Sequence, residues 1–292
     1  MFLEDLMKKI VFPISLLILL VLSGPILAQA QPADGMGGQH RAKVLAIEGA
    51  SPTEMDAWEK INRMTDIDSK GEEALSYLEK YPDGAYLPYV HGILAMYYQA
   101  KKDDDRFVEH AELAVQSLPD EVNLLAALSV TYAEKQKADP AIKYGKTALA
   151  ILPTAGAPQG MSTAKWEEIR MKLTADCNYG AGTGYLFKAF NLGGPDYLMT
   201  PAMQHLQEAT RLDPTNQAAQ FYLGFGYQIK EDLESAIPCY AKAAALQGSN
   251  TALAKQQLEN AYKKVHGNTK GVDKLISEQK KLFEAAAAST GE

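Results

Sequence analysis

The sequence predicts an all-α fold, a right-handed superhelical solenoid of antiparallel helix-turn-helix repeats. Three observations support this prediction. First, the stretch from Asn216 to Ser249 spaces large apolar residues about one helical turn apart and places small residues where two helices would cross. Second, the same pattern recurs 95 residues earlier and once more 34 residues before that, and Pro153 and Pro119 close these two earlier units. Third, strand-like alternation of apolar and polar residues occurs nowhere in the chain.

The best-formed unit shows why these residue types recur. Leu223 and Tyr227 lie one helical turn apart and face the same way, while Gly224 and Ala236 are small enough to let two helices approach closely. The equivalent residues of the earlier units are Leu128, Ser129, Tyr132, Ala141, Gly145 and Ala148, and before them Leu94, Ala95, Tyr98, Phe107, Ala111 and Ala114. On these residues the chain resembles the tetratricopeptide repeat (TPR) family, over roughly positions 53 to 288. One hairpin cannot bury its apolar face alone, so the resemblance implies a stack of hairpins.

Length and composition limit the possible functions. The 292 residues are 47% hydrophobic, which is enough for a sizeable core. The formal net charge is −7, so the chain has no general basic footprint, and nucleic-acid binding is disfavoured. Cys177 and Cys239 lack metal-type spacing, and we interpret them as buried packing residues. A disulfide between them stays open in an oxidising compartment, because the sequence does not show how close their Cα atoms come.

Residues 1–30 have the features of a cleaved export signal. Lys8 and Lys9 precede the apolar run Ile10 to Leu22, a Ser-Gly-Pro breaker follows, and Ala28-Gln29-Ala30 is a small-x-small cleavage site. The apolar run is shorter than the ~20 residues of a spanning helix. We therefore expect an exported protein that begins at Gln31 and keeps no stable membrane span after cleavage. The expected location is periplasmic, or secreted if the source lacks an outer membrane.

The mature chain divides into a leader and six helical units. Residues 31–50 are rich in glycine and are predicted to be a flexible leader. Folding is expected to begin at Ser51-Pro52-Thr53-Glu54, which resembles a capping box with proline at the first helical position. Hairpins are predicted at about 53–82, 86–119, 121–153, 161–214 with an insertion, and 216–249, followed by a C-terminal cap at 250–288.

The fourth hairpin contains the main departure from the 34-residue period. The extra residues fall in 154–176, which begins as a loop and continues as a helix, and in a longer turn over 191–196. Thr200-Pro201 is expected to begin the second helix of this hairpin, as Asp139-Pro140 does in the hairpin before it. The glycine-rich run from Tyr179 to Tyr185 has no strand before it, so we interpret its glycines as helix-crossing or bend residues and not as a phosphate-binding loop.

No catalytic or metal-binding constellation is apparent in the sequence. The five histidines are scattered and lack the paired spacing of metalloproteases, and no nucleophile elbow, P-loop or kinase signature occurs. We therefore predict a protein that is not an enzyme, with no cofactor and no metal site.

The TPR resemblance also implies where a partner binds. Family members recognise proteins or peptides on the concave face that the first helices of the hairpins form. Carrying the family's groove positions onto this chain gives Tyr89, Met96, Gln99, Asn123, Ala126, Val130, Asn178, Tyr185, Lys188, Phe221, Phe225 and Gln228. Only Lys188 is a cation, so the clamp for a partner's C-terminal carboxylates that some members use is not expected here. The aromatic and amide side chains instead favour an extended or helical segment.

These expectations lead to three functional hypotheses. The first is an exported, non-catalytic adaptor or scaffold that binds protein or peptide segments on its concave face and helps to assemble or organise envelope proteins. The second is an enzyme or small-molecule-binding protein with a site built on the 154–196 insertion. The third is a structural spacer without a specific ligand. A pocket with convergent titratable groups would favour the second, and an open trough of amide and aromatic groups would favour the first.

Overall fold

The computed structural model describes residues 47, 49–158 and 160–290, with side chains up to residue 288. Over this part of the chain every regular element is a helix. The predicted all-α solenoid of antiparallel helix-turn-helix repeats is confirmed. The export signal and most of the expected leader lie outside the described residues.

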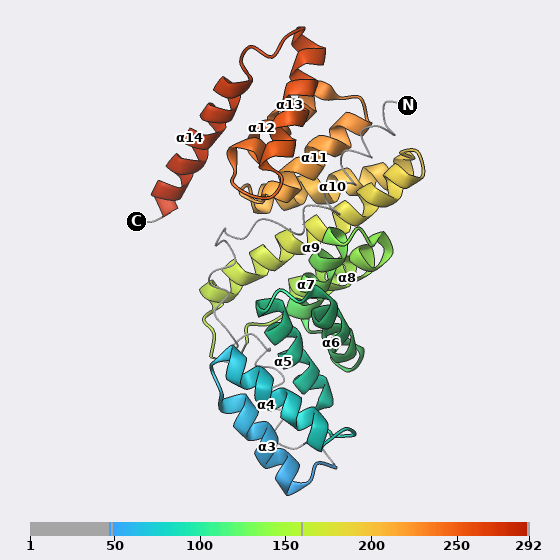
Figure 1. The fold of residues 1–292 in the computed structure, drawn as a ribbon, viewed down its shortest axis with the longest axis vertical. Helices are drawn as coiled ribbons and strands as arrows, with labels where there is room; N and C mark the ends of the chain where they lie inside the picture. Colours follow the sequence, from blue (N-terminus) through green and yellow to red (C-terminus); the bar gives the residue numbers. More distant parts are fainter. Residues whose placement is uncertain (1–46, 48, 159, 291–292) are drawn as a thin grey trace. The chain divides into compact units, whose positions relative to one another are not determined.

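The helices form consecutive hairpins along the chain (Figure 1). We call the first helix of each hairpin its A helix and the second its B helix. The A and B helices are, in pairs, α3 (Pro52–Arg63) and α4 (Ile67–Lys80), α5 (Leu87–Ala100) and α6 (Asp104–Ser117), α7 (Val122–Glu134) and α8 (Ala138–Ile151), α9 (Thr163–Asn191) and α10 (Asp196–Leu212), α11 (Gln217–Ile229) and α12 (Leu233–Ala245), and α13 (Thr251–His266) and α14 (Val272–Thr290). A short 3₁₀ turn, η2 (Leu152–Thr154), follows α8.

The turn inside a hairpin follows one local rule. Lys102, Gln136 and Glu231 all have positive φ, and each follows the C-cap residue of an A helix. In each case the next amide bonds back across the helix end, for example from Asp103 N to the Tyr98 carbonyl at 2.9 Å. This is the Schellman pattern, which satisfies the last carbonyls of a helix and reverses the chain. Gly193 (φ 80°) adopts the same arrangement after α9.

Proline ends several of the B helices. Tyr81, Leu118 and Asp213 are the C-cap residues of α4, α6 and α10, and each precedes a proline and has left the helical region of φ and ψ. A residue before proline is sterically biased away from helical backbone, so these sequences stop the helix and let the next hairpin begin. Leu152 also precedes a proline but stays helical, and the chain continues into η2.

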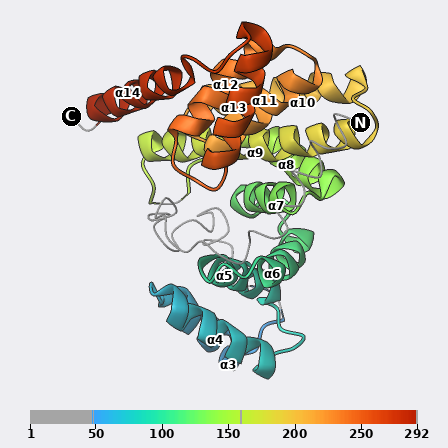
Figure 2. The same cartoon turned by 45° about the horizontal axis from the view of Figure 1, so that its top comes forward.

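The ends of the array also follow from sequence. Ser51 caps α3 as predicted, since its hydroxyl accepts from Glu54 N at 3.2 Å. The capping box is incomplete, because the Glu54 carboxylate instead accepts from Tyr77 Oη at 2.5 Å and from Ala85 N at 2.6 Å. Gly267 (φ 77°) adopts the left-handed conformation and ends α13. α14 then packs mainly on α12 (Figures 1 and 2).

The insertion lengthens α9, which lies between the α7–α8 hairpin and the α10–α11 pair (Figure 1). Its glycines lie at helix crossings, as the sequence predicts. A Cβ on Gly180 would lie 2.8 Å from the carbonyl carbon of Ser129, and one on Gly184 would lie 2.9 Å from the Ala138 oxygen. Gly182 faces the other way, toward Leu206 of α10. Alternate glycines therefore allow close packing on two sides of one helix.

One expected helix start is wrong. α10 begins at Asp196, not at Thr200-Pro201, so Pro201 lies inside the helix. Pro195 occupies the N-cap position with extended backbone, and Gly193 and Gly194 complete the reversal before it. Residues 196–199 thus form an added first turn of α10, before the predicted start. Across the described helices, none is long and apolar enough to cross a bilayer.

Candidate partner-binding face

The A helices α5 and α7 carry the first group of predicted groove residues. Tyr89 is half-buried, and its ring lies 5.7 Å from that of Trp58 on α3. Met96 is half-buried and Gln99 is exposed, so both reach the surface of α5. On α7, Asn123 and Val130 are half-buried. Ala126, also on α7, is buried and belongs to the core.

The second group lies on α9 and is tied down by neighbouring helices. Asn178 is buried; its side-chain oxygen lies 2.8 Å from His205 Nδ1 of α10, and its amide donates to the Thr174 carbonyl. Tyr185 is half-buried and stacks on His205 with ring centroids 5.9 Å apart. Lys188 forms a 2.6 Å ion pair with Asp139, at the start of α8. Tyr185 and Lys188 thus reach the surface, whereas Asn178 links α9 to α10.

The expectation that Phe221 and Phe225 are exposed in the groove is wrong. They are 0% and 1% exposed. Phe221 packs 5.8 Å from the Tyr240 ring of α12, and Phe225 packs 5.7 Å from the Phe190 ring of α9. Gln228, the third predicted residue of α11, is half-buried and accepts a hydrogen bond from Tyr240 Oη at 2.8 Å. The surface of α11 is therefore largely packing surface.

The physical reason is the size of the side chains that α9 presents to α11, and the repeat register around the insertion shows which residues these are. Gln136, Gly193 and Glu231 occupy the same position in three equivalent turns, so they define the repeat register. Gly193 lies 57 positions after Gln136 and 38 positions before Glu231. In this register Val130 corresponds to Phe187 and Phe225, and not to Tyr185. Phe187 and Phe190 are bulky, so α9 covers the side of α11 that would otherwise be open. The longer turn after Asn191 shifts the repeat register. The period in the sequence does not show at which residues this shift occurs.

Four further side chains lie on α7, α9 and α11, of which α9 contacts both of the others. Tyr179 on α9 and Tyr222 on α11 are 4% and 7% exposed, with ring centroids 6.4 Å apart. Asp176 lies one helical turn before Tyr179, and Glu134 is the last residue of α7. We call Glu134, Asp176, Tyr179 and Tyr222 the acid–tyrosine cluster.

The acid–tyrosine cluster has an electrostatic environment that disfavours negative charge. The protein surrounding Glu134, together with Asp104 and Asp176, raises the pKa of this carboxyl to about 7. Burial raises the pKa of Asp176, against the opposing effect of Lys172 at 3.5 Å. Burial likewise raises the pKa of Tyr222 to about 12 and that of Tyr179 further. Since Asp176 belongs to the inserted segment, the insertion contributes to this group of titratable side chains.

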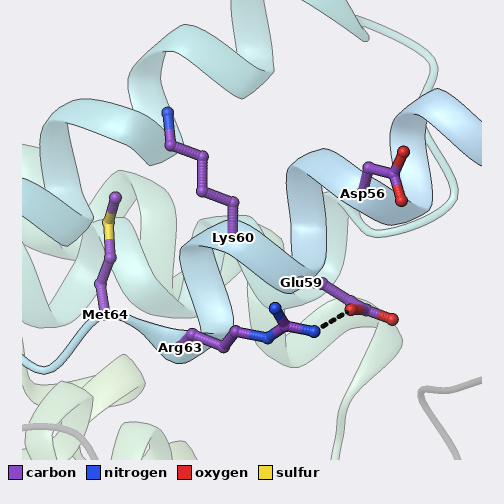
Figure 3. Close-up of a pocket in the computed structure, with 5 residues that line it drawn as sticks. All are labelled: Asp56, Glu59, Lys60, Arg63 and Met64. Carbon is purple, nitrogen blue, oxygen red and sulfur yellow. Dashed lines mark hydrogen bonds and ion pairs between the residues drawn. The ribbon is translucent and has the colours of Figure 1, made fainter.

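A separate hollow of about 490 Å³ opens beside α3 (Figure 3). It is lined by Asp56, Glu59, Lys60, Arg63 and Met64. Arg63 pairs with Glu59 at 2.5 Å, and Lys60 pairs with Glu73 at 2.6 Å, so its charges largely neutralise each other. The side chains are mostly exposed, and exposed pairs of this kind contribute little energy.

The other candidate polar groups are structural. His91 and His110, which the sequence separates by 19 residues, meet between α5 and α6 with Nδ1 atoms 2.9 Å apart. Cys177 and Cys239 are buried free thiols. Within the described residues no group of three or more His, Cys, Asp or Glu side chains is placed to hold a metal ion.

Most of the acid–tyrosine cluster could not be predicted from the sequence. Tyr179 lies in the glycine-rich run, but nothing in that run relates it to Tyr222. Glu134 lies directly before the turn at the end of α7, where a carboxylate is ordinarily solvated. The cluster forms only because α9 brings Asp176 and Tyr179 to α7 and α11. To predict this cluster from the sequence, the length that the insertion adds to α9 would have to be known first.

Comparisons with known proteins add similarities of structure only. No protein-family model matches the chain, and no curated protein matches it in sequence. Two crystal structures of MamA are similar, at 19% and 20% identity, with TM-scores of 0.45 and 0.43; they cover 70% and 67% of this chain and 95% and 97% of their own. Yeast Tom70 is similar at 15% identity and a TM-score of 0.48, over 92% of this chain and 49% of its own.

Proposed function

We propose that this protein is an exported, non-catalytic adaptor that binds protein or peptide segments on its A-helix face, in envelope assembly or organisation. The A-helix face is the surface that Tyr89, Met96, Gln99, Asn123 and Val130 form on α5 and α7. The observation that carries the proposal is that aromatic, apolar and amide side chains reach the surface from these two consecutive A helices. Such a surface offers stacking and side-chain hydrogen bonds to an extended or helical segment.

Packing accounts for these side chains only in part, because Tyr89 and Met96 contact the core and still reach the surface. The cores of the α5–α6 and α7–α8 hairpins are built from residues such as Leu94, Tyr98, Leu128 and Tyr132, which are all buried. Met96 and Val130 lie two residues further along the same helices and remain half-buried. The export part of the proposal is supported by the residues that resemble a signal sequence and its cleavage site.

Affinity capture from a cell-envelope extract, followed by identification of the bound proteins, tests the proposal. We expect Met96→Glu and Val130→Glu together to abolish capture, because a charge on each of two adjacent A helices disrupts an apolar contact. Loss of a binding anchor costs ≥2 kcal/mol, or roughly 30-fold in affinity.

Leu113→Glu is the matched control. Leu113 is an apolar residue, 39% exposed, on the B helix α6. This variant should capture the same proteins as the wild type, and circular dichroism should show that all the variants keep their helices. If capture persists in the double variant and is lost in Leu113→Glu, the partner binds the B-helix side and the proposal is wrong.

A further inference from the structure

Among the described residues, the first and last helices of the stack have neighbours on one side only. α3 packs mainly on α4, and α14 packs mainly on α12. Each helix from α5 to α12, by contrast, contacts helices that come both before and after it in the chain. In an array of hairpins each unit is held by its neighbours, so the two ends present the surfaces that a further unit would cover.

The two end pairs of helices carry opposite net charge. α3 and α4, with the turn between them, hold eight acidic and four basic side chains in residues 52–80, a net charge of −4. α13 and α14, with their turn, hold seven lysines and four acidic side chains in residues 251–290, a net charge of +3. These are the most negative and the most positive of the six helix pairs. The two ends of the stack are therefore electrostatically complementary to each other.

Some of these charges have no counter-charge in the described part of the chain. At the α3–α4 end, the exposed carboxylates of Asp56 and Glu72 make no ion pair and no hydrogen bond there. Asp56 lines the hollow beside α3, and the other charged residues that line this hollow are all in ion pairs (Figure 3). On α14 the exposed side chains of Lys280 and Lys281 also make no ion pair with the described residues. Each end thus offers charges that a second molecule can neutralise.

α14 also carries an apolar side that its neighbours cover incompletely. Leu275, Ile276 and Phe283 follow one side of the helix at helical spacing, yet all three are only half-buried. Leu282 beside them is 62% exposed. On α12, which lies between other helices, Tyr240 is fully buried. The last helix of the stack therefore combines unpaired lysines with accessible apolar surface.

We propose that copies of this protein associate head to tail, with the α13–α14 end of one copy bound to the α3–α4 end of the next. The two unpaired lysines of one copy lie against the two unpaired carboxylates of the other. Leu282 enters the hollow of about 490 Å³ beside α3, where Met64 offers an apolar contact. Because two different surfaces meet, each copy keeps one end free for a further copy, and association gives open chains or closed rings. This inference goes beyond the proposed function, since no residue of the A-helix face takes part.

Sedimentation velocity of the whole protein at several protein and salt concentrations tests the association. At about 20 mM salt we expect the weight-average sedimentation coefficient to rise with protein concentration. At about 0.5 M salt it should fall toward the value of the monomer, because salt screens attraction between exposed charges. A sedimentation coefficient that does not change with protein concentration at low salt would overturn the proposal.

Charge reversal at each end distinguishes a head-to-tail contact from one between identical surfaces. The head variant carries Asp56→Lys and Glu72→Lys, and the tail variant carries Lys280→Glu and Lys281→Glu. Each variant should stay monomeric alone, because its two ends now carry like charge. An equimolar mixture should associate, because the unchanged tail of the head variant meets the unchanged head of the tail variant. Association of either variant alone, or a mixture that stays monomeric, would overturn the proposal.

The matched control reverses two charges within an inner hairpin. Glu231→Lys with Glu234→Lys changes the net charge as the head variant does, at exposed residues of the α11–α12 hairpin. Lys102 occupies the turn position of Glu231 in the α5–α6 hairpin, so lysine suits this backbone. The control should associate as the wild type does, and circular dichroism should show that all the variants keep their helices. Loss of association in the control would assign the effect to total charge and overturn the proposal.

Leu282→Ser tests the apolar part of the contact. It should raise the dissociation constant of self-association roughly tenfold, because a leucine side chain no longer leaves water. The salt dependence should stay as in the wild type, since the charges at both ends are unchanged. An unchanged dissociation constant in Leu282→Ser would show that α14 does not contact the hollow, and the proposed contact would be wrong.

Discussion

Phe225 is a residue whose environment determines its role. Its ring is 1% exposed and packs against Phe190 of the preceding A helix. We therefore expect Phe225→Ala to lower the free energy of unfolding by ~3–5 kcal/mol, the usual cost of emptying a large core position. Urea denaturation followed by circular dichroism measures this. Tyr197→Ala, at an aromatic side chain that is 71% exposed on α10, serves as the control and should change stability little.

The burial of Phe225 could not be predicted from the sequence. Met96, Val130 and Phe225 occupy one repeat position in the register that the turns define, yet the first two are half-buried and Phe225 is buried. The difference comes from the neighbour, since α9 presents Phe187 and Phe190 to α11. A periodic pattern gives the direction of a side chain on its own helix but not the size of the side chains that face it.

The His91–His110 pair gives the protein a predicted pH dependence. Their Nδ1 atoms share a hydrogen bond, in which one must donate and the other accept. Burial lowers the pKa of both side chains; Glu109 opposes this in both, and the positive charge of Arg106 adds to it for His110. A folded-state pKa below the unfolded value of about 6.5 means that unfolding takes up protons as the pH falls. The contribution of the two neutral histidines to the free energy of unfolding is therefore present above about pH 6.5 and lost below it.

Melting temperature measured against pH tests this expectation. It should fall as the pH is lowered from about 7.5 to about 5.5, across the ordinary histidine pKa. His110→Gln should flatten the fall, whereas His266→Gln, at an exposed histidine on α13, should not. An equally steep fall in His110→Gln would assign the pH dependence to other groups.

At the scale of elements, the close packing of α9 on its neighbouring helices depends on glycines, which have no side chain, at the points where the helices cross. Gly180→Ala would gain ~0.5–1 kcal/mol from helix propensity. Its Cβ, however, would lie 2.8 Å from the Ser129 backbone, and over-packing of this kind costs ~1–3 kcal/mol. We expect net destabilisation, which would appear as a lower urea midpoint. Ser129→Ala in the same chain should restore only part of the loss, because the backbone contact remains. A higher midpoint in Gly180→Ala alone would mean that the crossing is looser than the structure shows.

Most elements could be predicted because their signals are local. Ser51-Pro52 marks the start of α3, Gly267 marks the end of α13, and X-Pro marks the ends of three B helices. The start of α10 was predicted wrongly because Pro201 is tolerated inside the helix while Pro195 occupies the N-cap position. Either proline would suit a helix start, and the sequence alone does not decide between them.

For the whole molecule, a stack of hairpins predicts uneven local stability. α9 contacts helices on both sides, whereas α3 packs mainly on α4 and α14 mainly on α12. Since each unit of a repeat array is held by its neighbours, units at the ends open at lower free energy than the centre. Native-state hydrogen exchange should therefore be slowest in the part of α9 around Gly180 and fastest in α3 and α14. Equal protection of α14 and α9 would contradict this expectation.

The candidate site was less predictable than the fold because part of it depends on how separate hairpins meet in the whole molecule. Tyr89, Met96 and Val130 follow the 34-residue period and could be located from it. The acid–tyrosine cluster combines the end of α7, an inserted turn of α9 and a residue of α11. No repeat position joins these three segments. Their meeting depends on the length of α9, which the period does not give.

The glycines of α9 also bear on the order in which the hairpins assemble. Similar hairpins can in principle stack in the wrong sequence or exchange between copies of a chain. Gly184 of α9 fits closely against Ala138 and Ala141 of α8, whereas the position in α6 that corresponds to Ala141 is Phe107. A phenylalanine has no room at so close a crossing. α9 therefore fits the α7–α8 hairpin and not the α5–α6 hairpin at this crossing, which specifies one junction of an otherwise repetitive array.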